Sequence, residues 1–206
     1  MGSTTTPRRS NTRQRIQDVA LKLFLEQGYE KTALREISDE LGVTKAALYY
    51  HFKTKEDILV SLFRDLGRHM DELIAWGKRQ PRELAVKQEL LARCSVIFHD
   101  AAPLFDILIA NQATLDALSV GQDFKDRVAA LSDLLQEENS SLNARVRCAT
   151  ALLTLHFGTF AIRQLDGDPE EKRLALLAGA TELLTSAHEG ILSGTAGPAA
   201  GVPPEG

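Results

Sequence analysis

The residues best suited to a chemical task lie between Thr32 and Lys55, where the sequence reads TALREISDELGVTKAALYYHFKTK. Tyr49, Tyr50 and His51 are consecutive, so one helix cannot bury all three. Exposed phenol and imidazole groups beside lysines suit the phosphate oxygens of nucleic acid. The spacing therefore predicts a polar surface that contacts DNA.

Two short helices joined by a tight turn would hold these groups in place. Leu34, Ile37 and Leu41 recur at helical spacing. Gly42 ends that helix, because glycine adopts the left-handed conformation of a helix end at little cost. Thr44 is placed to cap the next helix through its hydroxyl. This helix-turn-helix pattern puts the start of its second helix into the major groove.

The same pattern is compatible with an ordinary helical hairpin that carries a solvated lysine. Two features of the neighbouring sequence favour DNA. Lys53 and Lys55 add positive charge, and Thr54 can cap a further helix that begins at Lys55. The positive end of a helix dipole beside a lysine is a good seat for phosphate.

The run GVTKAALYYHFKTKEDIL resembles the signature of the tetracycline-repressor (TetR) family of bacterial regulators. The resemblance covers about residues 13 to 63. It implies an all-helical homodimer, usually a repressor, that a small ligand releases from its operator. Upstream it includes an amphipathic helix followed by Gly28-Tyr29, Thr32, Arg35 and Ile37.

The resemblance also suggests roles for single residues at the DNA. Lys45 lies at the exposed first turn of the recognition helix and would touch a base edge, most readily guanine. Ala46 and Ala47 would make apolar contacts such as one with a thymine methyl group. Most of the others would hold the DNA backbone, although Arg35 could also reach a base. The complete predicted DNA-binding set is Thr32, Arg35, Thr44, Lys45, Ala46, Ala47, Tyr49, Tyr50, His51 and Lys55.

Charge is divided unevenly along the 206 residues, whose net charge is −4. Residues 1–55 hold ten Lys/Arg and six Asp/Glu, whereas residues 56–206 hold fourteen and twenty-two. A basic head on an acidic body fits nucleic acid at one end only. The hydrophobic fraction of 44% is enough for a sizeable core, and abundant Leu and Ala favour helices.

Several classes of function find no support in the sequence. P-loop, dinucleotide, HExxH and GxSxG patterns are absent, so we expect no enzyme and no cofactor. Cys94 and Cys148 lie in apolar helical patterns and have no zinc spacing, which favours buried thiols. The N-terminus resembles no secretory signal, and the longest uncharged run, residues 148–162, is too short for a bilayer. These features predict a soluble cytoplasmic protein.

The chain as a whole is predicted to be all-α, with a three-helix helix-turn-helix head at residues 12–54 and a six-helix ligand-binding and dimerisation body at 55–193. Residues 1–11 are expected to be disordered, with Arg8 and Arg9 either along DNA or merely solvated. The Gly/Pro-rich residues 194–206 are expected to be disordered too. A first helix opens at Asn11 or Thr12 and ends at Gly28. The body helices are expected at Lys55–Gly77, Arg82–Asp100, Pro103–Leu118, Asp123–Glu138, Leu142–Leu165 and Pro169–Leu192.

The last two helices are apolar on nearly every side, at residues 148–162 and 174–184. A helix of this kind must be covered all round. Packing against a second copy as a four-helix bundle would cover it, and an arginine at Leu155 or Leu177 would then be buried without a partner, giving monomers or unfolded chain. The alternative is that both helices form the central core of a monomer.

A largely apolar pocket for a small effector is expected in the body, next to the long helix that starts at Lys55. The same side chains would alternatively only fill the core. A function of another class also stays open, namely a helical small-molecule or lipid-binding protein, or an enzyme, with a helical appendage. The predicted pocket residues are His69, Trp76, Cys94, Phe98, Phe105, Leu108, Asn111, Gln112, His156 and Phe160.

Overall fold

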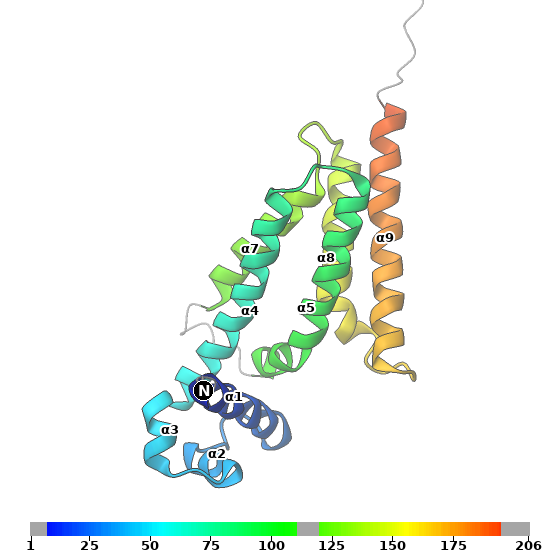
Figure 1. Cartoon of the computed structure of the whole chain (residues 1–206). Coiled ribbons are helices and arrows are strands. Elements are labelled where there is room, and N and C mark those ends of the chain that lie inside the picture. Colours follow the sequence, from blue (N-terminus) through cyan, green and yellow to red (C-terminus); the bar gives the residue numbers. More distant parts are fainter. Residues whose placement is uncertain (1–7, 111–119, 195–206) are drawn as a thin grey trace, which may run out of the picture. The chain divides into compact units, whose positions relative to one another are not determined.

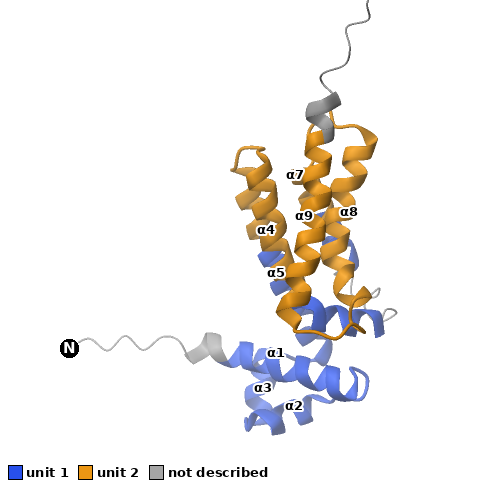
Figure 2. Cartoon of the chain, turned by 90° about the vertical axis from the view of Figure 1, so that its right-hand side faces the viewer, with its two compact units in different colours: residues 1–71, 100–127 blue, residues 72–99, 128–206 orange. Residues whose placement is uncertain are grey.

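The structure of the chain is a computed structural model that describes residues 8–110 and 120–194. All regular structure within these residues is helical, which confirms the predicted fold class (Figure 1). The chain divides into two compact units (Figure 2). Unit 1 is residues 1–71 and 100–127, and unit 2 is residues 72–99 and 128–206. The helices are α1 (Arg8–Gln27), α2 (Leu34–Leu41), α3 (Lys45–His51), α4 (Lys55–Lys78), α5 (Leu84–Ala110), α7 (Val120–Leu135), α8 (Leu142–Ala161) and α9 (Pro169–Gly194).

Helices α1, α2 and α3 cluster at one end of unit 1, followed directly by the first part of α4 (Figure 1). Their core is built from the apolar stripe of each helix, as the periodicity predicts. Ile16 and Ala20 of α1, Ile37 of α2 and Leu48 of α3 are completely buried. Three short helices make a small core, so residues of α4 contribute to it as well. Ile58 and Leu59 are likewise completely buried.

The turn between α2 and α3 follows the local signals in the sequence. Gly42 adopts φ 65° and ψ 33°, and its N–H donates to the carbonyls of Ser38 and Asp39. An L-residue with a side chain rarely adopts that conformation, which explains the glycine. The Thr44 hydroxyl accepts a hydrogen bond from the Ala47 N–H at 3.2 Å. The predicted stop and cap are both confirmed.

The predicted break at Pro103 is wrong. Helix α5 runs without interruption from Leu84 to Ala110, with Pro103 inside it. Proline removes one backbone donor and crowds the preceding turn, but the rest of the helix keeps its own bonds. Burial of Leu104, Phe105 and Ile107 beyond the proline stabilises the continued helix. Two predicted helices, Arg82–Asp100 and Pro103–Leu118, are therefore one over the described residues.

Other helix boundaries differ from the prediction by a few residues. Helix α1 begins at Arg8, so Arg8 and Arg9 belong to the helix rather than to a separate arm. Helix α7 is shifted towards the N-terminus, and α8 ends at Ala161 instead of Leu165. Helix α4 matches its predicted range to within one residue. Helix ends depend on weak terminal bonds, so differences of this size are ordinary.

Helices α8 and α9 pack side by side within unit 2 (Figures 1 and 2). Ser141 caps α8 by accepting a bond from the Ala144 N–H at 3.2 Å. A Cβ atom at Gly158 would lie 2.4 Å from Leu176 Cδ2, so glycine is what permits this close helix contact. Leu152 and Leu155 of α8 and Leu184 of α9 are buried. Within the described residues, no helix is both long and apolar enough to cross a membrane.

Candidate nucleic-acid interface

The first turn of α3 presents a row of uncovered side chains. Lys45, Ala46 and Ala47 are all exposed. The Thr44 cap satisfies one backbone N–H of this turn and leaves the remaining first-turn donors available. A cation and two small side chains at a helix N-terminus leave room for a base edge and attract negative charge.

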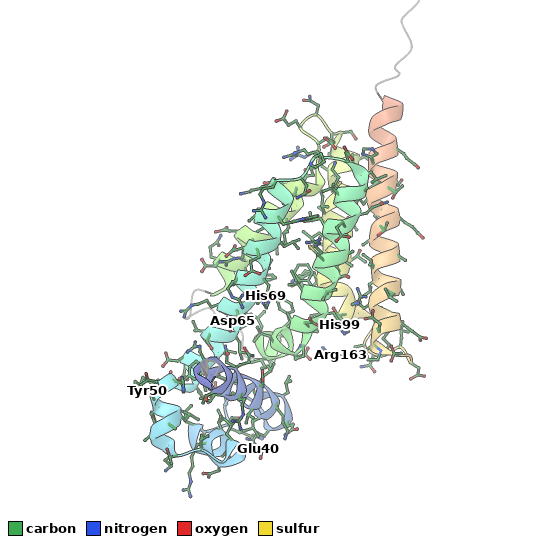
Figure 3. The ribbon with its side chains drawn as sticks, viewed as in Figure 1. Glu40, Tyr50, Asp65, His69, His99 and Arg163 are labelled. Atoms are coloured by element: carbon green, nitrogen blue, oxygen red, sulfur yellow. The ribbon has the colours of Figure 1, made fainter. Side chains whose placement is uncertain are left out.

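The exposed aromatic groups follow directly on the same helix. Tyr49 and Tyr50 are 44% and 72% exposed, and Tyr50 lies at the outer side of α3 (Figure 3). The Tyr50 and His51 rings meet edge to face, with centroids 5.2 Å apart. Large aromatic side chains are normally covered, and these carry hydrogen-bonding groups at their tips. The arrangement suits contacts with phosphate oxygens, as predicted.

The opposite face of α3 fixes the helix to its neighbours. Leu48 and Phe52 are buried, which confirms their predicted core positions. The Arg13 guanidinium of α1 lies 4.3 Å from the centre of the Phe52 ring, in a cation–π contact. Packing of this buried face therefore fixes the orientation of α3 and leaves its other face exposed.

Two predicted DNA contacts, Thr32 and Arg35, differ in their surroundings. Thr32 is buried, and its hydroxyl donates to the Gly28 carbonyl at 2.9 Å. The Arg35 side chain is 73% exposed and lies 3.5 Å from the Asp39 carboxylate, an ion pair of small energetic weight. Arg35 can therefore leave Asp39 and bind DNA instead. Thr32 stabilises the turn that precedes α2 through its hydrogen bond to Gly28.

Lys55 is tied into the protein at the start of α4. Its ammonium donates to the carbonyls of Tyr29 at 2.9 Å and Glu30 at 3.1 Å, and its side chain is only 18% exposed. It also lies 4.4 Å from the centre of the Tyr29 ring. The Tyr29 hydroxyl donates to Glu56 at 3.1 Å, and burial, followed by the Glu56 charge, raises the pKa of Tyr29. Lys55 therefore fastens the α1–α2 loop to α4, a role that the sequence did not reveal.

The predicted pocket residues are divided between the units. His69, Phe105 and Leu108 belong to unit 1, and the described remainder belong to unit 2. Phe98 and His156 are in contact, with ring centroids 5.3 Å apart. Asn111 and Gln112 lie outside the described residues. Trp76 lies under the Arg93 guanidinium, Cys94 is buried, and Phe160 lies under the guanidinium of Arg163.

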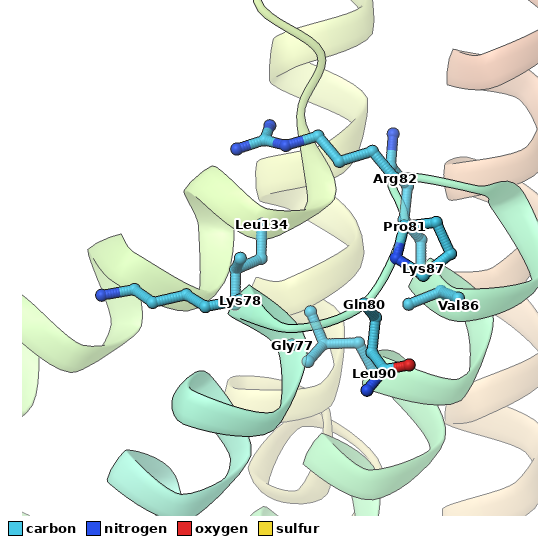
Figure 4. A pocket seen from close by; sticks show the side chains of 9 residues that line it. All are labelled: Gly77, Lys78, Gln80, Pro81, Arg82, Val86, Lys87, Leu90 and Leu134. Carbon is cyan, nitrogen blue, oxygen red and sulfur yellow. The ribbon is translucent and has the colours of Figure 1, made fainter.

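The cavities described in unit 2 are lined by other residues. One of about 120 Å³ lies where α4 passes into α5, and another of about 10 Å³ lies between α5, α8 and α9 (Figure 4 shows the first). Lys87 borders the first and is buried in an ion pair with Glu137. In Figure 4 the charged end of Lys78 extends away from the other lining residues. The first cavity is lined by Gly77, Lys78, Gln80, Pro81, Arg82, Val86, Lys87, Leu90 and Leu134.

Sequence reasoning missed two polar contacts of α4 within unit 1. In the first, Gln17 of α1 donates to Ser61 of α4. Gln17 is buried on the stripe of α1 that also carries Arg13, Ala20 and Phe24. Its place at helical spacing among core residues was a signal that it has a buried partner. Arg127 of α7 pairs with Asp71 of α4, and no spacing in the sequence links two residues so far apart. Among the described residues, no cluster of His, Cys, Asp or Glu could hold a metal ion.

Comparison with known proteins relates the head to a family of regulators. Residues 16–62 match the model of the bacterial regulatory proteins of the tetR family. The chain is 38% identical over 118 residues to the HTH-type transcriptional regulator AcrR of Shigella flexneri, covering 50% of this chain and 55% of that protein. It is 31% identical over 111 residues to an HTH-type regulator of Staphylococcus aureus strain USA300, covering 54% and 55%. The chain thus spans about half the length of the curated relatives that it matches.

Solved structures resemble a larger share of the chain. AmtR of Mycobacterium smegmatis superposes with a TM-score of 0.67 at 22% identity, covering 91% of this chain and 98% of that one. A transcriptional regulator of Aquifex aeolicus gives 0.65 at 20% identity, covering 84% and 99%. At these identities the likeness concerns the fold. Together with the matched head, it supports the resemblance of this chain to the tetR family of bacterial regulatory proteins.

Proposed function

We propose that this protein is a DNA-binding transcriptional regulator that responds to a small ligand. The observation that carries the proposal is the exposed first turn of α3, where Lys45, Ala46 and Ala47 follow the Thr44 cap. A short helix held from behind by buried Leu48 and preceded by a glycine turn has the geometry of a recognition helix. The matched head and its relatives, which are named as transcriptional regulators, support it.

The protein acts as a homodimer in this proposal. Helix α8 leaves an apolar stripe uncovered within the single chain, since Leu142, Val146, Leu153 and Phe157 are 75%, 53%, 46% and 54% exposed. Their spacing of four, seven and four residues places them on one helix face. Isolated exposed aliphatic residues are ordinary, but a stripe of four indicates a covered surface. A second α8–α9 pair would cover it as a four-helix bundle.

Two recognition helices related by a two-fold axis would fit successive major grooves, roughly 34–36 Å apart. The operator is then an inverted repeat. Bound across a promoter, such a dimer would block transcription, so we propose a repressor that works in the cytoplasm, where its DNA is. Its effector would be small and largely apolar, bound in the body and oriented by a few polar groups such as His156.

Release would operate through α4, which is one continuous helix from Lys55 to Lys78. Displacing it as a rod changes the separation of the two heads. An effector that favours the displaced state by about 3 kcal/mol would weaken DNA binding more than a hundredfold.

Selection of bound fragments from genomic DNA tests the proposal. We expect enrichment of an inverted repeat and strongly salt-dependent binding to it. Random fragments bound with the same affinity, or no DNA bound at low salt, would contradict the proposal. Binding to lipid vesicles in the absence of DNA binding would instead support the alternative of a helical lipid-binding protein.

A further inference from the structure

Helix α4 carries two polar contacts in unit 1 that the proposed function has not used. One joins α4 to α1 of the DNA-binding head, and the other joins it to α7. Both involve charged or buried side chains on α4, which packing alone does not require. Asp65 and His69 mark this part of the helix in Figure 3.

The first contact is a buried amide that bridges two residues of α4. Gln17 Nε2 donates to Ser61 Oγ at 2.9 Å and to Asp65 Oδ2 at 2.7 Å. Gln17 and Ser61 are 1% and 2% exposed. The Ser61 hydroxyl itself donates to the Ile58 carbonyl at 2.7 Å, so its hydrogen is directed along α4. A buried donor that serves both a hydroxyl and a carboxylate fixes α1 and α4 in one register.

The second contact is a planar fork. Arg127 Nε and Nη2 donate to the two carboxylate oxygens of Asp71, at 2.9 Å and 3.0 Å. The Nη1 group donates to the Asp123 carbonyl at 3.1 Å, which holds the guanidinium on α7. Bidentate pairs of this kind constrain direction as well as distance. They prevent α4 from sliding along α7 without breaking two hydrogen bonds.

Gly67 lies one turn before Asp71, on the same face of α4. A Cβ atom there would lie 3.0 Å from Arg127 Cζ and 3.2 Å from Nη1. A glycine within a helix costs about 1 kcal/mol of stability compared with alanine. The guanidinium needs the space, which accounts for a glycine at a position where alanine would otherwise make a better helix.

The two contacts lie on different sides of α4. Asp65 and Asp71 are six residues apart, which at about 100° per residue puts them roughly 120° apart around the helix. One side is tied to the head through α1, and the other to α7. A shift of α4 against α7 is therefore passed to α1 through a buried hydrogen-bonded link.

We propose that Gln17 and Arg127 are positioning residues for DNA binding, which set the place of α4 and thereby the orientation of the head without touching DNA. The inference rests on the proposed function, because its readout is operator affinity. It adds to that function the residues that connect α4 to the recognition surface. Neither the DNA-contacting set nor the predicted effector pocket contains them.

Gly67→Ala is the decisive variant. The added methyl group displaces the guanidinium and weakens the fork, while alanine strengthens the helix itself. We expect a thermal midpoint equal to or above that of the wild type, together with operator binding about tenfold weaker, within the usual range of allosteric coupling. The slope of log affinity against log salt should stay unchanged, since every phosphate contact is retained. The matched control is Gly121→Ala on α7, where a Cβ meets nothing within 4 Å.

A double-mutant cycle then tests the connection through α4. Gln17→Leu should also weaken operator binding, and Gly67→Ala should add little in that background, because the link to α1 is already broken. If Gln17→Leu does not fold, Asp65→Ala supplies the test at the half-buried partner, because it removes the oxygen that accepts from Gln17. The inference is overturned if Gly67→Ala binds the operator like the wild type, or if the two effects simply multiply. A wild-type protein that selects no operator would instead refute the proposed function.

Discussion

The exposed faces of α3 and α8 differ in a way that separates two kinds of partner. Helix α3 exposes Lys45 and two tyrosines whose hydroxyl groups suit polar contacts, whereas α8 exposes Leu153 and Phe157 without a polar atom in their side chains. Both faces leave large side chains uncovered, so exposure alone does not say what binds. The chemistry of the exposed groups indicates the kind of partner. Hydroxyl groups and a cation suit phosphate oxygens and base edges, whereas apolar side chains suit a second apolar surface.

The largest expected effect follows from a charge on the α8 face. Phe157 is 54% exposed in the single chain, so Phe157→Arg should fold. In a dimer the arginine would be buried without a partner, which is strongly unfavourable. We expect a monomer by sedimentation and operator affinity lower by about a hundredfold or more, because a monomer binds only one half-site.

Val96→Arg is the matched control for this substitution. Val96 is another exposed apolar residue of unit 2, at 46%, but it lies on α5. Val96→Arg should therefore leave the dimer intact. Leu155, by contrast, is 3% exposed within its own subunit, so an arginine there would be buried in the single chain and would test only folding. A dimeric Phe157→Arg protein with full operator affinity would show that α8 does not form the interface.

Acid should destabilise unit 2 through His156, a buried side chain that meets the Phe98 and Phe157 rings edge to face. Burial lowers the pKa of His156 to about 4 from its ordinary 6.5. The neutral form is therefore favoured by folding, and its contribution is complete above pH 6.5 and is lost as the pH falls towards 4. We expect unfolding free energy to decrease by about 2–3 kcal/mol more in the wild type than in His156→Gln over this range.

Urea unfolding followed by the fluorescence of Trp76 measures this difference, since Trp76 is the single tryptophan and belongs to unit 2. The pH profile of the variant should be flatter. Parallel profiles for the two proteins would mean that His156 does not carry the acid sensitivity.

Lys45→Ala tests whether the exposed face of α3 contacts a base. Removal of a base contact is expected to reduce operator affinity by about 1–3 kcal/mol and to relax specificity at one position in each half-site. Fragment selection with the variant reads out both quantities. Lys31→Ala removes an exposed cation of the head that lies outside α3, and should leave the preferred sequence unchanged. An unaltered preference in Lys45→Ala would exclude this residue from base recognition.

The smallest expected effect concerns Lys55, whose ammonium already donates to two carbonyls. The Glu30 carboxylate lies 3.7 Å from the same ammonium, so a phosphate oxygen would compete with it for the third donor. Lys55→Met should lower the thermal midpoint, because the α1–α2 loop loses its tie to α4, and should weaken binding to all DNA sequences alike. It should also flatten the log–log salt dependence by about one unit for each phosphate that a subunit no longer neutralises. A lower midpoint with an unchanged slope would leave Lys55 with a structural role only.

The sequence predicted the head more closely than the body because the relevant signals are local there. The glycine at position 42 and the Thr44 cap act within a few residues, and both occur as expected. Pro103 failed as a local signal because packing of residues far away in the sequence stabilises α5 on either side of it. The apolar pattern of α8 likewise could not tell which side its own subunit covers. Leu155 turned out to be inside, and Phe157 outside.

The polar links of α4 show the same limit. Nothing in the sequence joins Arg127 to Asp71, since the pair is formed only when α7 meets α4. Gln17 was visible as a polar residue in an apolar stripe, but its partners were not. The proposed pocket residues depend most on such long-range packing, and Phe98 and His156 are the members that the structure brings into contact.

The central claim is that two α3 faces, joined through α8 and α9, recognise DNA together. It is tested most directly by titrating the selected operator and a duplex with one half of its inverted repeat scrambled, with the stoichiometry measured by sedimentation. The account predicts two chains on the intact operator and binding weaker by about a hundredfold or more on the scrambled duplex. One chain on each duplex, or equal affinity for both, would contradict it.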